Sequence, residues 1–187
     1  RMNYANIKYC DIANGVGVRT TLFVSGCRLH CPNCFNEEAW DFDAGEPFTD
    51  EVAEKIMSSL DTPYIDGLTI LGGEPMEPEN QVGLVGFLEA VRERFGDTKS
   101  IWLFSGHTWE QLAPGGAWNL GEVTDRLLDT LDVLVDGPFV QDKHDITLRF
   151  RGSSNQRLID VPATLEAPGG EVVWWHDDPV FSTHAME

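Results

Sequence analysis

The chain has 187 residues, of which 42% are hydrophobic, and this length predicts one domain or one domain with a small appendage. Its 13 Lys and Arg residues face 31 Asp and Glu residues, and the formal net charge of −18 argues against nucleic acid as a partner because little basic surface is available for phosphates. Neither an apolar run of membrane-spanning length nor a signal-peptide pattern occurs, so we expect no membrane association.

Segments with strand and helix patterns alternate along the chain. We expect apolar, β-branched strands at 20–25, 67–73, 100–106 and 132–137. Amphipathic helices are expected between them, at 49–60, 80–95 and 123–131. Thr49 is the predicted N-cap of the first helix, because acidic residues follow it in the first turn. This alternation predicts an α/β fold with mostly parallel strands, as a sheet or a partial barrel.

The last third of the chain has weaker patterns. Two further strands are expected at 147–152 and 157–161, and an edge strand at 171–175. The segment 161–171 contains Pro and Gly and is interpreted as a linker. We therefore predict a main domain over residues 1–160 and an unassigned C-terminal tail over 161–187.

Each of the first four predicted strands is followed by glycine together with a polar or metal-binding residue. The sequences at these positions are "SGCRLHCPNC", "GGEP", "SGH" and "DGPF". In parallel α/β folds, ligands bind beyond the carboxyl ends of the strands, so these four segments are expected to converge on one site. The alternative is that glycine only allows the chain to turn at each strand end.

Three of the four cysteines are crowded into one loop, as Cys27-x3-Cys31-x2-Cys34. Thiolates are the usual ligands of iron–sulfur clusters, and three of them on a four-iron cluster leave one iron open for a substrate. A zinc site would need Cys10 or His30 as a fourth ligand. Four cysteines in a chain of this size, three of them crowded, favour a reducing, cytoplasmic location over a secreted scaffold.

The cysteine spacing and the later "GGEP" resemble the radical S-adenosylmethionine (radical SAM) enzymes. The resemblance implies a partial (βα) barrel and a [4Fe-4S] cluster whose open iron chelates the amino and carboxylate groups of SAM. It also implies that one electron from the reduced cluster cleaves SAM into methionine and a 5′-deoxyadenosyl radical.

One subfamily is more similar than the rest. The common radical SAM pattern has an aromatic residue before the third cysteine, whereas here Asn33 holds that position and Phe35 follows the cysteine. The activating enzymes of anaerobic ribonucleoside-triphosphate reductase share this shift. The resemblance runs from Met2 to Asp160, in the blocks "NGVGVRTTLFVSGC", "CPNCFNEEAW", "GGEP", "IWLFSG", "VDGPFVQD" and "RGSSNQR".

The resemblance implies roles for individual residues. Cys27, Cys31 and Cys34 would hold the cluster and are the expected catalytic and metal-binding residues. The residues expected to bind SAM are Asn33, Phe35, Gly72, Gly73, Glu74, Ser105 and Asp136. Ser105 with Gly106 is equally consistent with an ordinary turn, and Asp136 with a helix cap.

The resemblance further implies a glycyl-radical activase. Its partner would be the glycyl radical subunit of anaerobic ribonucleoside-triphosphate reductase, and its electron donor a flavodoxin or ferredoxin-type protein. Arg151, Asn155 and Arg157 would guide the partner's peptide or pair with surface acids. The alternatives are a radical SAM enzyme that acts on a small molecule, and a zinc-stabilised interaction module without catalysis.

Overall fold

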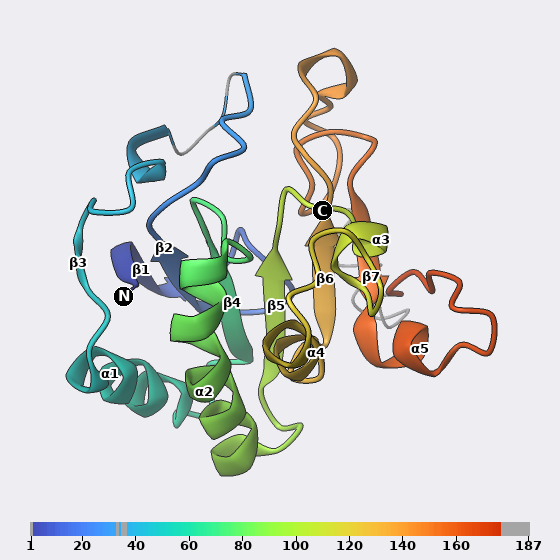
Figure 1. Cartoon of the computed structure of the whole chain (residues 1–187). Coiled ribbons are helices and arrows are strands. Elements are labelled where there is room, and N and C mark those ends of the chain that lie inside the picture. The colour runs from blue at the N-terminus through green and yellow to red at the C-terminus, as the bar shows by residue number, and fades with distance from the viewer. Residues whose placement is uncertain (1, 33, 35–36, 177–187) are drawn as a thin grey trace.

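A single mixed sheet of seven strands organises the computed structural model, which describes residues 2–32, 34 and 37–176 (Figure 1). The strands are β1 (Asn3–Asp11), β2 (Arg19–Val24), β3 (Glu46–Pro47), β4 (Gly67–Gly72), β5 (Ser100–Phe104), β6 (Val133–Asp136) and β7 (Arg157–Asp160). The helices are α1 (Asp50–Leu60), α2 (Pro78–Phe95), α3 (Trp109–Leu112), α4 (Glu122–Leu128) and α5 (Val161–Glu166), with short 3₁₀ turns η1 (Glu37–Ala39) and η2 (Gln141–Lys143).

The centre of the sheet is parallel and its edges are antiparallel. The strand order is β3-β1-β2-β4-β5-β6-β7, and β2, β4, β5 and β6 run in the same direction. Strands β1, β3 and β7 complete the edges in antiparallel pairing. Because helical crossovers join the parallel strands, the loops after their carboxyl ends all emerge at one edge, at the top of Figure 1. The predicted α/β fold with parallel strands is confirmed at this level, whereas the partial barrel of the radical SAM type stays a prediction.

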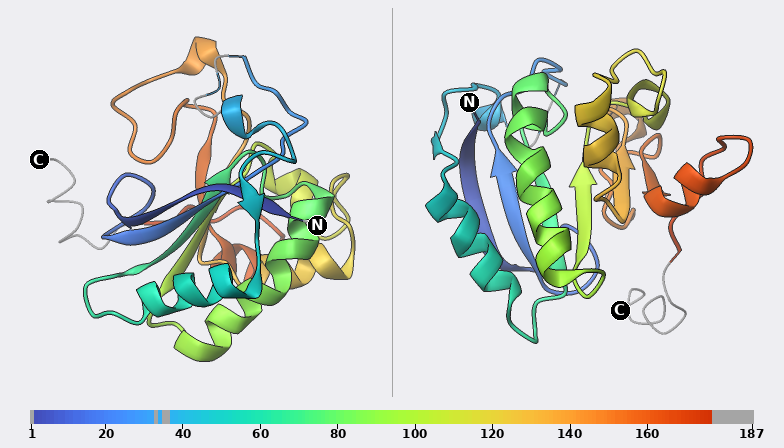
Figure 2. Two further views of the ribbon diagram at one scale, coloured as in Figure 1. Left: turned by 90° about the vertical axis from the view of Figure 1, so that its left-hand side faces the viewer. Right: turned by 60° about the horizontal axis from the view of Figure 1, so that its bottom comes forward.

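The two faces of the sheet are covered differently. Helices α1, α2 and α4 lie over one face, as both views in Figure 2 show. The larger hydrophobic cluster lies under these helices and includes Leu22, Ile70 and Leu103. Strand side chains alternate, so Trp102 points to the other face, where it packs edge-on against Phe150 and Trp175 at 5.1 and 5.0 Å between ring centroids. Loops, rather than helices, cover this second face.

The predicted elements in the first two thirds of the chain are present, with ends shifted by a few residues. Helix α1 begins as expected: the backbone N–H of Val52 donates to the Thr49 side chain at 3.3 Å, which caps the helix. Helix α4 is shorter than predicted because its C-cap at Asp129 ends it before the turn into β6. Strands β1 and β3 were not predicted, because β1 is largely exposed and shows no clear apolar alternation.

Three expectations for the last third were wrong. The segment 147–152 is not a strand, because Phe150 has a φ of +65° and Asp145 binds both the backbone and the hydroxyl of Thr147 in a turn. The expected linker 161–171 begins with helix α5, which accepts proline in its first turn and is capped by the Asp160 side chain. At 171–175 there is an isolated bridge between Trp174 and Ile159 instead of a full strand.

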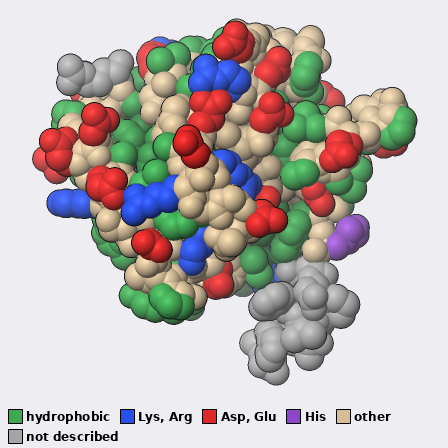
Figure 3. Space-filling view, turned by 90° about the horizontal axis from the view of Figure 1, so that it is seen from below, with side chains coloured by type: hydrophobic (Ala, Val, Ile, Leu, Met, Phe, Trp, Pro, Cys, Tyr) green, Lys and Arg blue, Asp and Glu red, His purple; other side chains and the backbone are tan. Residues whose placement is uncertain are grey.

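The charged side chains on the face opposite the strand ends are mixed. Seen from below, acidic side chains are spread over this face with basic ones between them, and they form no single patch (Figure 3). Within the described residues, no helix combines the length and the apolar character needed to cross a membrane.

Arg19 is a fully buried cation that ties the turn before β2 to the neighbouring strands. Its guanidinium donates to the Thr69 hydroxyl and to the backbone oxygens of Val16, Leu68 and Ser100 at 2.7–3.0 Å. Burial lowers its pKa to about 10, which shows that the charge is costly to bury. Polar contacts therefore offset a desolvation cost at this position.

We expect Arg19→Met to lower the free energy of unfolding by about 2 kcal/mol, because buried carbonyl oxygens lose their donors while the cost of burying a charge is relieved. Urea unfolding of the protein without its cluster measures this. Arg94→Met is the matched control, since Arg94 forms an exposed pair with Glu54 and should contribute less than about 0.5 kcal/mol. Equal stabilities of the two variants would contradict the structural role of Arg19.

Candidate cluster and cofactor site

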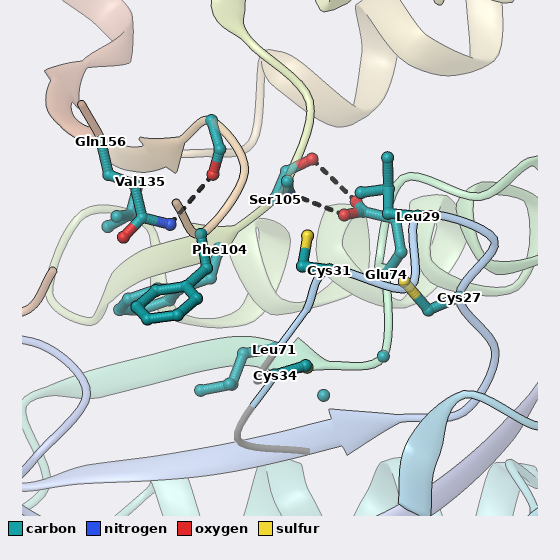
Figure 4. A pocket seen from close by; sticks show the side chains of 15 residues that line it. Cys27, Leu29, Cys31, Cys34, Leu71, Glu74, Phe104, Ser105, Val135 and Gln156 are labelled. Atoms are coloured by element: carbon teal, nitrogen blue, oxygen red, sulfur yellow. Dashed lines mark hydrogen bonds between the residues drawn. The ribbon is translucent and has the colours of Figure 1, made fainter. Parts of the chain in front are cut away.

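A recess at the carboxyl ends of the parallel strands collects most of the predicted site residues. We call it the cluster recess; it encloses about 650 Å³, counted with its opening to solvent. The predicted site residues that line it are Cys27, Cys31, Cys34, Gly72, Gly73, Glu74 and Ser105. Figure 4 shows the three cysteines beside this recess, with the apolar side chains of Leu71 and Phe104 also on its wall. Gly137 and Phe139, which follow β6, also line the recess, so the expected convergence is present for the loops after β2, β4, β5 and β6.

The cysteine loop begins at Gly26, where it crosses the turn that follows β4. The backbone N–H of Glu74 donates to the Gly26 oxygen at 2.7 Å, and the N–H of Gly26 donates to the Ala39 oxygen at 2.7 Å. A Cβ atom added to Gly73 would lie 2.5 Å from the Gly26 oxygen, so only glycine allows this close approach. The "GGE" turn and the start of the cysteine loop thus form one packed unit.

The chemistry of the three cysteines suits an iron–sulfur cluster. None of the four cysteines forms a disulfide, and Cys10 is exposed on β1, outside the lining of the cluster recess. Burial raises the pKa of Cys27 to about 11 and also raises the pKa of Cys31. Because metal ligands are thiolates, iron must displace these protons when it binds.

The described residues contain no group of three or more His, Cys, Asp or Glu side chains placed to hold a single metal ion. The three thiols instead border a shared space. His30, the other possible fourth ligand, stacks on Trp40 with ring centroids 4.2 Å apart.

Glu74 is buried in the wall of the recess and holds two loops together. It is 1% exposed, and its carboxylate accepts hydrogen bonds from the Gly106 N–H, the Ser105 hydroxyl and the Met76 N–H at 2.7–2.8 Å. Figure 4 shows Ser105 turned toward this carboxylate. The side chain therefore joins the turn after β4 to the loop after β5.

Burial raises the pKa of Glu74 to about 7. The folded state therefore holds this proton more tightly than the unfolded state, whose pKa is near 4.5. The corresponding stability is complete below about pH 4.5 and is lost as pH rises through about 7. Relative to Glu74→Gln, which does not titrate, we expect the unfolding free energy of the unaltered protein to fall by about 3 kcal/mol across this interval. The measurement is the unfolding free energy from urea titrations at a series of pH values. If it depends on pH in the same way for both proteins, the pKa of Glu74 is not raised.

One predicted site residue lies outside the lining of the cluster recess, and two others are not among the residues that the structure describes. Asp136 is buried at the end of β6, where it accepts hydrogen bonds from the Trp109 N–H at 2.7 Å and from the Arg157 guanidinium at 2.6 Å, and it does not line the recess. Asp136 therefore contacts the first residue of α3 and forms an ion pair with Arg157. Asn33 and Phe35 are outside the described residues.

Sequence reasoning missed the residues that hold the cysteine loop from behind. Glu77, fully buried before α2, accepts hydrogen bonds from the Arg28 N–H at 2.6 Å and from its guanidinium at 2.7 Å. The same guanidinium pairs with Glu79 at 2.6 Å and lies 4.4 Å from the centre of the Phe42 ring. An acidic residue before a helix indicates a cap, and nothing in the sequence distinguishes that use from a partner for the loop arginine.

Comparisons with known proteins agree with this site. Residues 13–159 match a family model described as a 4Fe-4S single cluster domain, which favours an iron–sulfur cluster over zinc. A Pasteurella multocida protein named anaerobic ribonucleoside-triphosphate reductase-activating protein is 40% identical over 83% of this chain and 95% of its own length. Proteins of the same name from Escherichia coli K12 and Enterobacteria phage T4 are 38% and 34% identical, over 83% and 94% of this chain and 96% and 100% of their own lengths. The chain therefore belongs to the family of anaerobic ribonucleoside-triphosphate reductase-activating proteins.

Proposed function

We propose that this protein uses a [4Fe-4S] cluster and SAM to generate a glycyl radical on anaerobic ribonucleoside-triphosphate reductase. The main support is one arrangement: three cysteines of a single loop, none of them in a disulfide, border the same recess as Gly72, Gly73 and Glu74. The reductase is the target that the names of the relatives give. A partial barrel of the radical SAM type is part of the proposal, as is a main domain ending at residue 160.

Different residues of the recess would bind the cluster and SAM. Cys27, Cys31 and Cys34 would bind the cluster. Together, the cluster and SAM supply, when bound, a carbon radical that can take a hydrogen atom from a peptide backbone. The backbone at Gly72 and Gly73, and the one carboxylate lone pair of Glu74 left by its three hydrogen bonds, would hold the methionine end of SAM.

Other roles follow from position. Leu71, Phe104 and Phe139 give the recess an apolar wall that limits water near the reacting atoms. Ser105, held by Glu74, would orient the ribose or carboxylate of SAM. Asn33 and Phe35 would flank SAM beside the third cysteine. Asp136 would act from behind the recess, through the end of β6.

A one-electron reductant is also required. We infer a flavodoxin or ferredoxin-type donor, and a cytoplasmic location, because the cluster ligands must remain reduced thiols.

The isolated protein, reconstituted without oxygen and supplied with reductant, is expected to cleave SAM slowly. Addition of the matched reductase should accelerate cleavage and produce an organic radical, because the partner fills the open recess and places its glycine within reach. Electron paramagnetic resonance should show a doublet from the one remaining α-hydrogen of the glycine. If 5′-deoxyadenosine accumulates while a bound reductase gains no such signal, the substrate is a small molecule and the activase proposal fails.

A further inference from the structure

A second recess adjoins the cluster recess on the face of the sheet that carries no helices. It encloses about 1030 Å³, counted with its opening to solvent. Leu71, Phe104, Phe139 and Gln156 line both recesses, so the two spaces lie side by side. A polypeptide segment bound in the second recess would therefore lie next to the cluster recess.

The charge in this second recess has one sign. Lys8 and Arg151 are the only charged residues among its described lining, and we call it the cationic recess. Neither residue forms an ion pair with a described residue, in a chain with 31 acidic residues. By contrast, most arginines outside it are paired with Asp or Glu: Arg28, Arg92, Arg94, Arg126 and Arg157.

Both cations are held against aromatic rings. The Lys8 ammonium lies 5.3 Å from the centre of the Phe23 ring, and the Arg151 guanidinium lies 5.5 Å from that of Trp174. Arg151 also donates to the backbone oxygen of Gln156 at 2.8 Å, while its Nε is buried without a hydrogen-bond partner in the described structure. A planar guanidinium that is fixed in this way and has unused donors is suited to a carboxylate.

We propose that the cationic recess binds a carboxylate of the reductase segment that carries the target glycine, through Lys8 and Arg151. This inference rests on the proposed function, which requires a polypeptide to reach the cluster recess. The carboxylate belongs to an Asp or Glu side chain or to a chain end of that segment. The carboxylate of SAM is the competing ligand, but in the proposed function it binds the open iron beside the cysteine loop.

The test uses the protein with its cluster, without oxygen, and the variants Lys8→Met and Arg151→Met. Each removes one charge and retains an unbranched side chain. Lys55→Met is the matched control, because Lys55 is exposed on α1 and makes no ion pair with a described residue. Calorimetric titrations measure the affinity for the matched reductase and, separately, for SAM, and iron content verifies that each variant holds its cluster.

Each recess variant is expected to bind the reductase about 10-fold more weakly, as for the loss of one charge-assisted hydrogen bond. The SAM affinity and the iron content of the recess variants should stay within about twofold of those of the unaltered protein. Lys55→Met should match the unaltered protein in reductase affinity, SAM affinity and iron content. Unchanged reductase affinity in both recess variants overturns the inference. A fall in SAM affinity of similar size also overturns it, because the cations then serve SAM.

A second measurement identifies the group on the partner. The probes are a synthetic peptide that spans the glycine segment of the reductase and the same peptide with every carboxylate converted to an amide. The unaltered protein should prefer the acidic peptide about 10-fold, and the Lys8→Met/Arg151→Met double variant should show no preference. Equal binding of the two peptides to the unaltered protein overturns the inference.

Failure of the proposed function would look different. If the acidic peptide is preferred through Lys8 and Arg151 but the unaltered protein forms no glycyl radical on the reductase, the contact stands and the activase reaction fails. If the radical forms and the recess variants bind the reductase normally, only the recess inference fails.

Discussion

Replacement of Cys27, Cys31 or Cys34 by alanine is expected to abolish both cluster binding and SAM cleavage. All three thiols border one recess, and a four-iron cluster that has already one open iron cannot lose a second protein ligand and remain bound. Iron and sulfide content after anaerobic reconstitution, together with 5′-deoxyadenosine formation, measure the effect. The expected loss is complete for each of the three variants.

Cys10→Ala provides the control for these variants. Cys10 is exposed on β1 and does not line the recess, and its φ of +60° is equally unfavourable for cysteine and alanine. This variant should retain most of its iron and its activity. Loss of the cluster in Cys10→Ala alone would disprove the assignment of three ligands from the loop.

Gly73→Ala is expected to destabilise the protein and its cysteine loop together. The added Cβ would lie 2.5 Å from the Gly26 oxygen and 2.7 Å from the Ala39 oxygen, both of them backbone atoms that cannot rotate away. We expect a loss of about 3 kcal/mol in the free energy of unfolding, by urea titration, because the turn and the cysteine loop must separate. Iron content should fall as well, since the loop that begins at Gly26 carries all three cysteines.

Gly86→Ala tests whether this effect is specific to the close approach. Gly86 lies on the exposed side of α2, and nothing lies within 4 Å of the position that its Cβ would take. Alanine should therefore raise the free energy of unfolding by up to about 1 kcal/mol, through helix propensity alone. Similar destabilisation by the two substitutions would mean that the 2.5 Å approach at Gly73 is relieved at little cost.

The sequence predicts best where local pattern and burial agree. Thr49 and the acidic residues after it indicate a helix start, and α1 begins there. The four parallel strands are apolar because helices or loops cover both of their faces, so β2, β4, β5 and β6 were all anticipated. Convergence of their carboxyl ends follows from parallel topology, and it brings the cysteines, the "GGE" turn and Ser105 to one recess.

Contacts between distant segments could not be predicted. Arg28 pairs with the buried Glu77 as well as with Glu79. Arg157 pairs with the buried Asp136 as well as with Glu110. Nothing in the local sequence pattern selects these carboxylates among the 31 acidic residues of the chain. Strand β1 has few buried side chains, so its pairing with β2 is decided by backbone hydrogen bonds and not by apolar alternation. The strand predicted at 147–152 is absent although its residues favour a strand, because the turn around Asp145 overrides this propensity.

The position of the cysteine loop separates the cluster ligands from the hydrophobic core. Cys31 and Cys34 are only partly buried, and none of the three loop cysteines belongs to either hydrophobic cluster under or over the sheet. The polypeptide can therefore complete its sheet before any iron arrives, unlike zinc fingers, whose folding depends on the metal. We therefore expect iron and sulfide to bind a protein that is already folded, and a cluster destroyed by air to be restored by reconstitution of the same molecule.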